Sequence, residues 1–245
     1  MTPYYEQDGI TIFHGDCREI LPLLGPVDLI LTDPPYGDTS LEWDTRVEAW
    51  VPLLGRLAPQ AWMLGSLRFV LDVMPAWERS GWRLAQEVVW EKHNGSGFHA
   101  DRFKRVHEFA IHLYQPPWER CYRNPPVTMD ATPRTVRRKT RPTHTGHIEN
   151  GSYRSEDGGP RLMRSVIRCR SEHGRAVHPT QKPLGILRPL IQHSCQPGGV
   201  VLDPFMGSGS SLLAARELGR GAIGIEIEES YCEAAVGRLA QGVLL

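Results

Sequence analysis

The chain has 245 residues, which is enough for one large domain or for a core domain with a sizeable insertion. Hydrophobic residues make up 40% of it and charged residues 23%, a balance typical of a globular protein with a packed core. The N-terminal segment MTPYYEQDGI lacks the features of a secretory signal, and no apolar run approaches the roughly 18 residues of a membrane span. We therefore expect a cytoplasmic protein that has no membrane partner.

The cysteines support the same location. There are five of them, an odd number, and they are scattered without the CxxC spacing of a zinc or redox site. This pattern predicts free thiols in a reducing compartment and no bound metal. The cysteines are Cys17, Cys121, Cys169, Cys195 and Cys232.

The formal net charge of zero hides a segregation of charge along the chain. Residues 115–175 hold 13 Lys and Arg against 6 Asp and Glu, whereas the remainder holds 15 against 22. A basic segment within an acidic body indicates a polyanionic partner. A solvated loop would have the same composition, and charge alone leaves the two interpretations open.

Hydrophobic periodicity predicts seven strands that alternate with helices. In chain order the expected elements are strand 9–16, helix 17–25, strand 27–33, helix 47–58, strand 60–66, helix 68–80, strands 83–90 and 108–114, a helix beginning near Pro183, strand 200–205, helix 210–219, strand 220–227 and helix 228–239. This is the α/β pattern of a doubly wound, mostly parallel sheet.

Residues 115–175 interrupt this pattern. They are rich in Pro, Thr, Arg and Gly and show little periodicity, so we interpret them as an inserted module. The chain then divides into a first core half (1–114), the insert (115–175) and a second core half (176–245). The segment 90–105 follows a strand end, where either a closing flap or an ordinary surface loop is expected.

A glycine turn follows the strand expected at 200–205. The sequence DPFMGSG leads from this strand into a helix, so backbone amides and a helix N-terminus can approach an anionic group there. As a dinucleotide fingerprint it is incomplete, because Leu212 stands where the third glycine belongs. Glu226 ends the next strand, at the spacing of an acid that holds ribose hydroxyls. The two features together favour a ribose-bearing cofactor.

A second motif, DPPY at residues 33–36, ends the apolar run that begins at Val27. By itself the sequence Asp-Pro-Pro is typical of a turn. Together with HPTQKP (178–183) and DPFMGSG (203–209), it resembles the DNA amino-methyltransferases. More narrowly, it resembles the group in which the catalytic motif precedes the cofactor motif and target recognition lies between them. Family members have a seven-stranded, Rossmann-like sheet.

The resemblance implies S-adenosylmethionine as the cofactor and no metal. Asp16 matches the family acid that accepts a hydrogen bond from the adenine amino group, although a helix N-cap is the alternative role for this residue. Glu226 would hold the ribose, the glycine turn the methionine carboxylate, and His178, Thr180 and Lys182 the methionine end. The expected cofactor-binding residues are Asp16, Cys17, Asp33, His178, Thr180, Lys182, Asp203, Pro204, Phe205, Gly207, Ser208, Gly209 and Glu226.

The resemblance assigns catalysis to Asp33, Pro34, Pro35 and Tyr36. The lone pair of an exocyclic base amine is delocalised into the ring, so the amine is a poor nucleophile. Two groups that accept hydrogen bonds from its N–H bonds would pull the nitrogen toward a tetrahedral shape and free the lone pair. The Asp33 carboxylate and the Pro34 carbonyl can be these acceptors, and the proline pair stiffens their loop. Tyr36 offers a ring on which a flipped base can stack.

The expected partner is double-stranded DNA, contacted by Arg134, Arg137, Arg138, Lys139 and Arg141 of the insert. In the family, Asp at the first motif position favours adenine N6, and Ser favours cytosine N4. Four alternatives stay open: methylation of cytosine N4, methylation of RNA or protein, an inactive DNA-binding relative, and a nicotinamide oxidoreductase. The sequence does not reveal the recognition site, a homodimer or a cognate restriction endonuclease.

Overall fold

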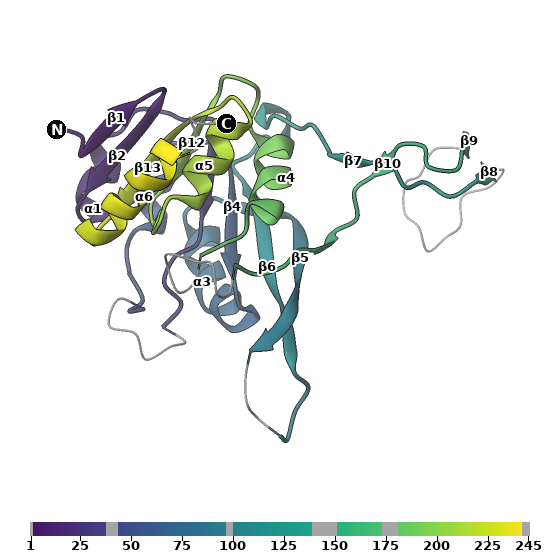
Figure 1. The fold of residues 1–245 in the computed structure, drawn as a ribbon, viewed down its shortest axis with the longest axis horizontal. Coiled ribbons are helices and arrows are strands. Elements are labelled where there is room, and N and C mark those ends of the chain that lie inside the picture. The colour runs from purple at the N-terminus through teal and green to yellow at the C-terminus, as the bar shows by residue number, and fades with distance from the viewer. Residues whose placement is uncertain (1, 38–43, 97–99, 139–150, 173–180, 242–245) are drawn as a thin grey trace. The chain divides into compact units, whose positions relative to one another are not determined.

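A computed structural model describes residues 2–37, 44–96, 100–138, 151–172 and 181–241. The chain divides into a larger unit, Met1–Asn124 with Ser165–Leu245, and a smaller unit, Pro125–Arg164 (Figure 1). The smaller unit is shorter than the insert expected at 115–175. Both ends of that range belong to the larger unit because their backbone is bonded to it. Asn124 N, for example, donates to His193 O at 2.8 Å.

One sheet of nine strands forms the centre of the larger unit in the described chain. Its spatial order is β1 (Tyr5–Gln7), β2 (Ile10–His14), β13 (Gly221–Glu226), β12 (Val200–Asp203), β3 (Leu29–Thr32), β4 (Gln60–Gly65), β6 (Arg105–Tyr114), β5 (Arg83–Ser96) and β11 (Val166–Arg168). The run from β2 to β4 is parallel, whereas β6 is antiparallel to both of its neighbours. The predicted α/β class and the seven predicted strands are confirmed.

The structure adds β1 and β11 at the two edges of the sheet. Each has three residues, too few to show a hydrophobic period. The segment expected as a loop at 90–105 is shorter than predicted, because β5 continues to Ser96 and β6 begins at Arg105.

Six α-helices and two 3₁₀ turns accompany the strands of the described larger unit. They are α1 (Cys17–Ile20), η1 (Leu21–Leu23), α2 (Val51–Leu54), α3 (Leu67–Arg79), η2 (Trp118–Arg120), α4 (Leu184–Ser194), α5 (Ser210–Glu217) and α6 (Glu229–Gln241). Two are much shorter than predicted. The helix expected at 17–25 tightens into η1 where Pro22 occurs. That expected at 47–58 is reduced to α2, which ends at Leu54, just before Gly55.

Helices cover both faces of the sheet, and β3 shows why its sequence is apolar throughout. Leu29 and Leu31 pack on one face in the cluster that includes α4, α5 and α6. Ile30 packs on the other face with residues of α1, α2 and α3. Because successive side chains of a strand point to opposite faces, a strand between two helical layers needs apolar residues at every position.

The pairing of β3 with β12 positions the functional motifs. These strands are parallel neighbours in which Val201 pairs with Leu29 and Leu202 with Ile30. Their carboxyl ends therefore meet at one edge of the sheet, although they come from opposite halves of the chain. In open α/β sheets this edge is where ligands bind.

The smaller unit contains two short antiparallel ribbons. One pairs β7 (Val127–Thr128) with β10 (Arg161–Leu162), and the other pairs β8 (Arg134–Arg138) with β9 (Gly151–Ser155). None of the helices in the described part of the chain has the length and apolarity that a membrane span requires.

Candidate active site

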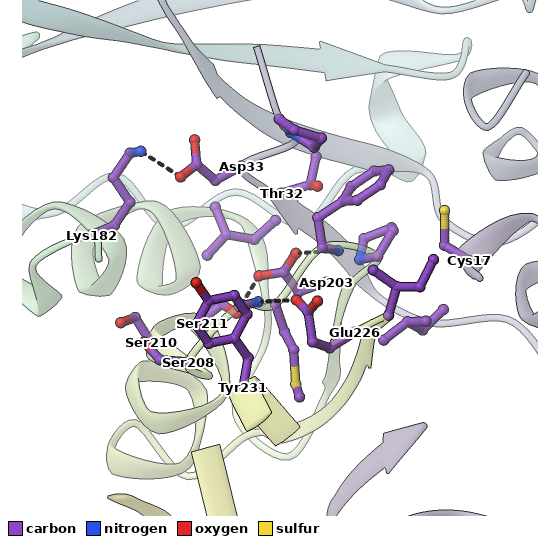
Figure 2. A pocket seen from close by; sticks show the side chains of 18 of the residues that line it. Cys17, Thr32, Asp33, Lys182, Asp203, Ser208, Ser210, Ser211, Glu226 and Tyr231 are labelled. Carbon is purple, nitrogen blue, oxygen red and sulfur yellow. Dashed lines mark hydrogen bonds and ion pairs between the residues drawn. The ribbon is translucent and has the colours of Figure 1, made fainter. Parts of the chain in front are cut away.

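A single pocket lies at the carboxyl ends of β3, β12 and β13. Asp33 and Glu226, the two acids with the most specific sequence predictions, both line it, and Asp203 lies with them (Figure 2). Apolar side chains make up much of the remaining wall, among them Leu31 and Phe205. The pocket therefore combines carboxylates with surfaces on which a planar ring can pack.

The glycine turn that borders this pocket requires its glycines. Gly209, the residue before α5, has φ +73°, and a Cβ atom there would lie 2.9 Å from the Cβ atom of Ala235 in α6. Arg238 of α6 stabilises the turn through two hydrogen bonds, in which its Nη1 donates to Ser208 O at 2.6 Å and to Ser210 Oγ at 3.0 Å. No local motif identifies Arg238, and the sequence prediction missed it.

Glu226 is fixed in place by backbone amides. Its Oε2 accepts from Gly207 N at 2.9 Å and its Oε1 accepts from Glu228 N at 2.9 Å. Burial raises the pKa of the Glu226 carboxyl, although these amides oppose the shift. The carboxylate therefore ties the end of β13 to the glycine turn at a fixed position on the pocket wall.

Asp203 ends β12 and is buried. Its Oδ1 accepts from Phe205 N at 3.1 Å, and its Oδ2 accepts from the Ser211 hydroxyl of α5. Burial raises the pKa of Asp203 to about 7, and the nearby carboxylates of Asp33 and Glu226 add to the shift. Asp203 therefore links the turn to α5, and it binds a proton more readily than an exposed aspartate does.

Asp33 is held through both of its carboxylate oxygens. The Tyr36 hydroxyl donates to Oδ1 and the Lys182 ammonium donates to Oδ2. Burial raises the pKa of Asp33, an effect that Lys182 opposes and Glu108 reinforces. Lys182 is only 8% exposed, yet Asp33 and Glu108 outweigh its burial and raise its pKa. The ammonium group therefore stays charged beside the carboxylate.

Lys182 also belongs to a row of charged residues that extends to two strands of the sheet, β6 and β5. Glu108 Oε2 of β6 lies 3.7 Å from Lys182 Nζ, and Glu108 Oε1 accepts from the Lys92 ammonium of β5. These two residues were not predicted from the sequence. A lone acid in a strand carries no local signal, and its partner Lys182 is distant in the sequence.

Asp16 and Cys17 lie at the start of α1 on the pocket wall. Asp16 is the N-cap of this helix, where Oδ1 accepts from Arg18 N at 2.8 Å. Hydrogen bonds from the Arg18 side chain lower the pKa of Asp16. Burial raises the pKa of the Cys17 thiol to about 12, so this cysteine is protonated and is not a nucleophile.

Most of the predicted cofactor-binding residues line the pocket. The pocket is lined by Asp16, Cys17, Asp33, Pro35, Lys182, Asp203, Pro204, Phe205, Gly207, Ser208 and Glu226. Pro34, Tyr36 and Gly209 are neighbours of lining residues without lining the pocket themselves. His178, Thr180, Lys139 and Arg141 lie outside the described residues, and Arg134, Arg137 and Arg138 form β8 of the smaller unit. The pocket is also lined by Arg18, Gln181, Ser210, Ser211 and Tyr231, none of which had been assigned individually.

Residues 27–237 match the family model of the N6/N4 methyltransferases, described as DNA methylase. The chain belongs to this family of DNA amino-methyltransferases. It is 29% identical over 276 aligned positions to the type II methyltransferase M.ScaI of Streptomyces caespitosus, with 97% of this chain and 83% of the relative covered. It is 28% identical over 263 positions to M.HinfI of Haemophilus influenzae, with 94% and 68% covered.

Solved structures agree with this assignment. The crystal structure of the M1.HpyAVI–SAM complex superposes with a TM-score of 0.68 and 27% identity, covering 94% of this chain and 98% of that one. The PvuII DNA methyltransferase, a cytosine-N4-specific enzyme, superposes with a TM-score of 0.65 over 96% of this chain and 88% of that one. Its identity of 16% supports the shared fold alone.

Proposed function

We propose that this protein transfers a methyl group from S-adenosylmethionine to N6 of an adenine flipped out of double-stranded DNA. The observation that carries this proposal is that Asp33 and Glu226 line one pocket. The acid expected at the target amine and the acid expected at the ribose are therefore close enough to serve one cofactor.

The chemistry of the pocket fits the cofactor. S-adenosylmethionine carries a cationic sulfonium and an ammonium group, and the wall beside the glycine turn supplies the acidic side chains of Asp203 and Glu226. Apolar residues beside them suit the adenine ring. Glu226 would hold the ribose hydroxyls, and the turn at Gly207 the methionine carboxylate. When bound, the cofactor supplies an electrophilic methyl group.

The Asp33 carboxylate would accept a hydrogen bond from one N–H group of the target amine, and the Pro34 carbonyl would accept a hydrogen bond from the other N–H group. Its raised pKa makes Asp33 a better proton acceptor than an exposed aspartate. The Tyr36 hydroxyl keeps the carboxylate in one orientation. The Tyr36 ring packs against Phe69 with centroids 4.9 Å apart, which fixes the aromatic surface that we assign to the base.

We assign contact with DNA to the ribbon of β8 and β9. Residues alternate between its two faces, and the register places Thr135 opposite Arg154 and Arg137 opposite Ser152 on one face. All four are exposed, and all carry hydrogen-bonding side chains. A two-stranded ribbon fits the major groove, where such side chains read base edges.

Expression in a methylation-free host tests the proposal. Nucleosides from the host DNA are analysed by mass spectrometry, and single-molecule sequencing locates the modified sites. We expect N6-methyladenine within one short sequence. If N4-methylcytosine is found instead, the protein is a cytosine-N4 methyltransferase. If neither product is found although the cofactor binds, the protein is an inactive DNA-binding relative.

A further inference from the structure

Both carboxylate oxygens of Asp33 are already occupied, which conflicts with its proposed role. Asp33 must accept a hydrogen bond from the target amine, yet its Oδ1 accepts from Tyr36 and its Oδ2 from Lys182. Lys182 is buried beside it, so an ammonium displaced from Asp33 would need another partner within the protein. If Lys182 stayed on Asp33, its charge would also make the carboxylate a weaker proton acceptor.

Glu108 offers Lys182 another partner. It is 9% exposed, and its Oε2 accepts no hydrogen bond from the described residues. This oxygen lies 3.7 Å from Lys182 Nζ, so the two groups form an ion pair but are too far apart for a hydrogen bond. A buried carboxylate oxygen without a donor is rare in a folded protein. Lys92 holds the other oxygen, Oε1, so Oε2 keeps a fixed position.

We propose that Glu108 is a positioning residue that receives the Lys182 ammonium when the target base occupies Asp33 Oδ2. Only a hydrogen bond moves in this exchange, from Asp33 Oδ2 to Glu108 Oε2, and no covalent bond changes. Without substrate, Lys182 neutralises the buried Asp33 carboxylate. With substrate, the base amine takes its place, and Glu108 keeps the displaced ammonium paired.

Charge arguments support this role for Glu108. The negative charge of Glu108 raises the pKa of Asp33, whereas Lys182 lowers it. Moving the ammonium toward Glu108 therefore strengthens Asp33 as a proton acceptor when the amine is present. Besides each other, the ionisable groups that act on these two carboxylates are Lys182, Tyr36, Lys92 and Arg105. Asp33 in turn raises the pKa of Asp203.

The test compares Glu108→Gln, Glu108→Asp and a matched control, Glu87→Gln, which removes an exposed acid from β5. This inference rests on the proposed function, so the wild type must first methylate DNA from a methylation-free host. Single-turnover transfer of tritiated methyl groups is then measured across pH. Calorimetry measures cofactor affinity, and thermal unfolding reports stability.

For Glu108→Gln we expect unchanged cofactor affinity and a plateau rate that falls by about 10- to 100-fold, the effect of one misplaced hydrogen bond to a charged group. The acid limb of the pH profile should move to lower pH, because loss of the Glu108 charge lowers the pKa of Asp33. Glu108→Asp keeps the charge and should recover part of the rate. Glu87→Gln should match the wild type.

A second measurement needs neither cofactor nor DNA. Carbon-13 NMR of the aspartate carboxyls, with Asp33→Asn to assign the signal, should give a lower Asp33 pKa in Glu108→Gln than in the wild type. An unchanged plateau rate, or a lower rate with an unmoved acid limb and unmoved NMR titration, would overturn the inference. A wild type inactive on every DNA would contradict the proposed function instead, and the NMR result would still decide the electrostatic coupling.

Discussion

Asp33 and Asp203 stand at the carboxyl ends of neighbouring parallel strands, β3 and β12, and act on each other electrostatically inside one pocket. One begins the motif assigned to the base, and the other begins the motif assigned to the cofactor. The negative charge of Asp33 raises the pKa of Asp203, because two like charges close together disfavour ionisation. This juxtaposition leads to separate predictions for the two halves of the site.

Asp33→Asn should abolish most methyl transfer while cofactor binding persists. The amide keeps the size of the side chain but is a weaker hydrogen-bond and proton acceptor, so we expect a fall of about 10²- to 10⁴-fold in single-turnover rate. Cofactor affinity, measured by calorimetry, should stay close to the wild-type value. Survival of the wild-type transfer rate would remove Asp33 from the proposed mechanism.

Glu226→Gln should act on binding instead. The carboxylate is assigned to the ribose hydroxyls and also holds Gly207 N, so its neutralisation should weaken cofactor affinity by about 10- to 100-fold. Glu228→Gln, two residues on and exposed, is the matched control. Equal affinities of both variants in calorimetry would contradict the ribose assignment.

Replacing Arg137 of β8 and Arg154 of β9, which lie on the same face of the ribbon, by alanine should weaken DNA binding and leave cofactor affinity unchanged. Each lost phosphate contact should reduce the slope of log affinity against log salt by about 0.9. If Arg137 contacts a base edge instead, its replacement alone should relax the recognised sequence. Arg79→Ala, an exposed arginine of α3, is the control in fluorescence anisotropy at several salt concentrations.

Asp203 makes stability depend on pH. Its folded-state pKa of about 7 lies above the ordinary value of about 3.9, so the folded state binds the extra proton between these values. This contribution to stability is complete below pH ~4 and is lost as the pH rises through about 7. The free energy of unfolding of Asp203→Asn, relative to the wild type, should therefore rise by about 2–4 kcal/mol over that interval.

Urea unfolding at a series of pH values measures this difference. Asp157→Asn, at an exposed position in the smaller unit, is the control and should give a constant difference. A constant difference for Asp203→Asn as well would show that Asp203 ionises as an ordinary surface aspartate.

The sequence predicted the sheet well because a strand between two helical layers leaves a strong signal. The unbroken apolar run at Leu29–Leu31 is an example, since each face of β3 is buried. Strands β1 and β11 have no such signal, because three residues at an edge need only backbone pairing. Helix α2 was overestimated for the opposite reason: the apolar spacing around it continues beyond the residues that have helical backbone.

The site was predictable where chemistry is concentrated in short motifs. Asp33 and Glu226 each end a strand, and parallel strands bring their carboxyl ends to one edge. Arg238 and Glu108 were missed because each acts through a partner far away in the sequence. Arg238 reaches back from α6 to Ser208, and Glu108 approaches Lys182 across the core. Such contacts depend on three-dimensional packing, which no local pattern encodes.

The ladder between β3 and β12 has a consequence for engineering. Because Val201 is level with Leu29, the two motifs are spaced by backbone hydrogen bonds and not by side chains. A slip of one residue would move Asp33 by about 3.3 Å and turn it toward the opposite face of the sheet. The loops that choose the DNA sequence or the base can therefore be exchanged with little effect on the separation of methyl donor and acceptor, provided that this ladder stays intact.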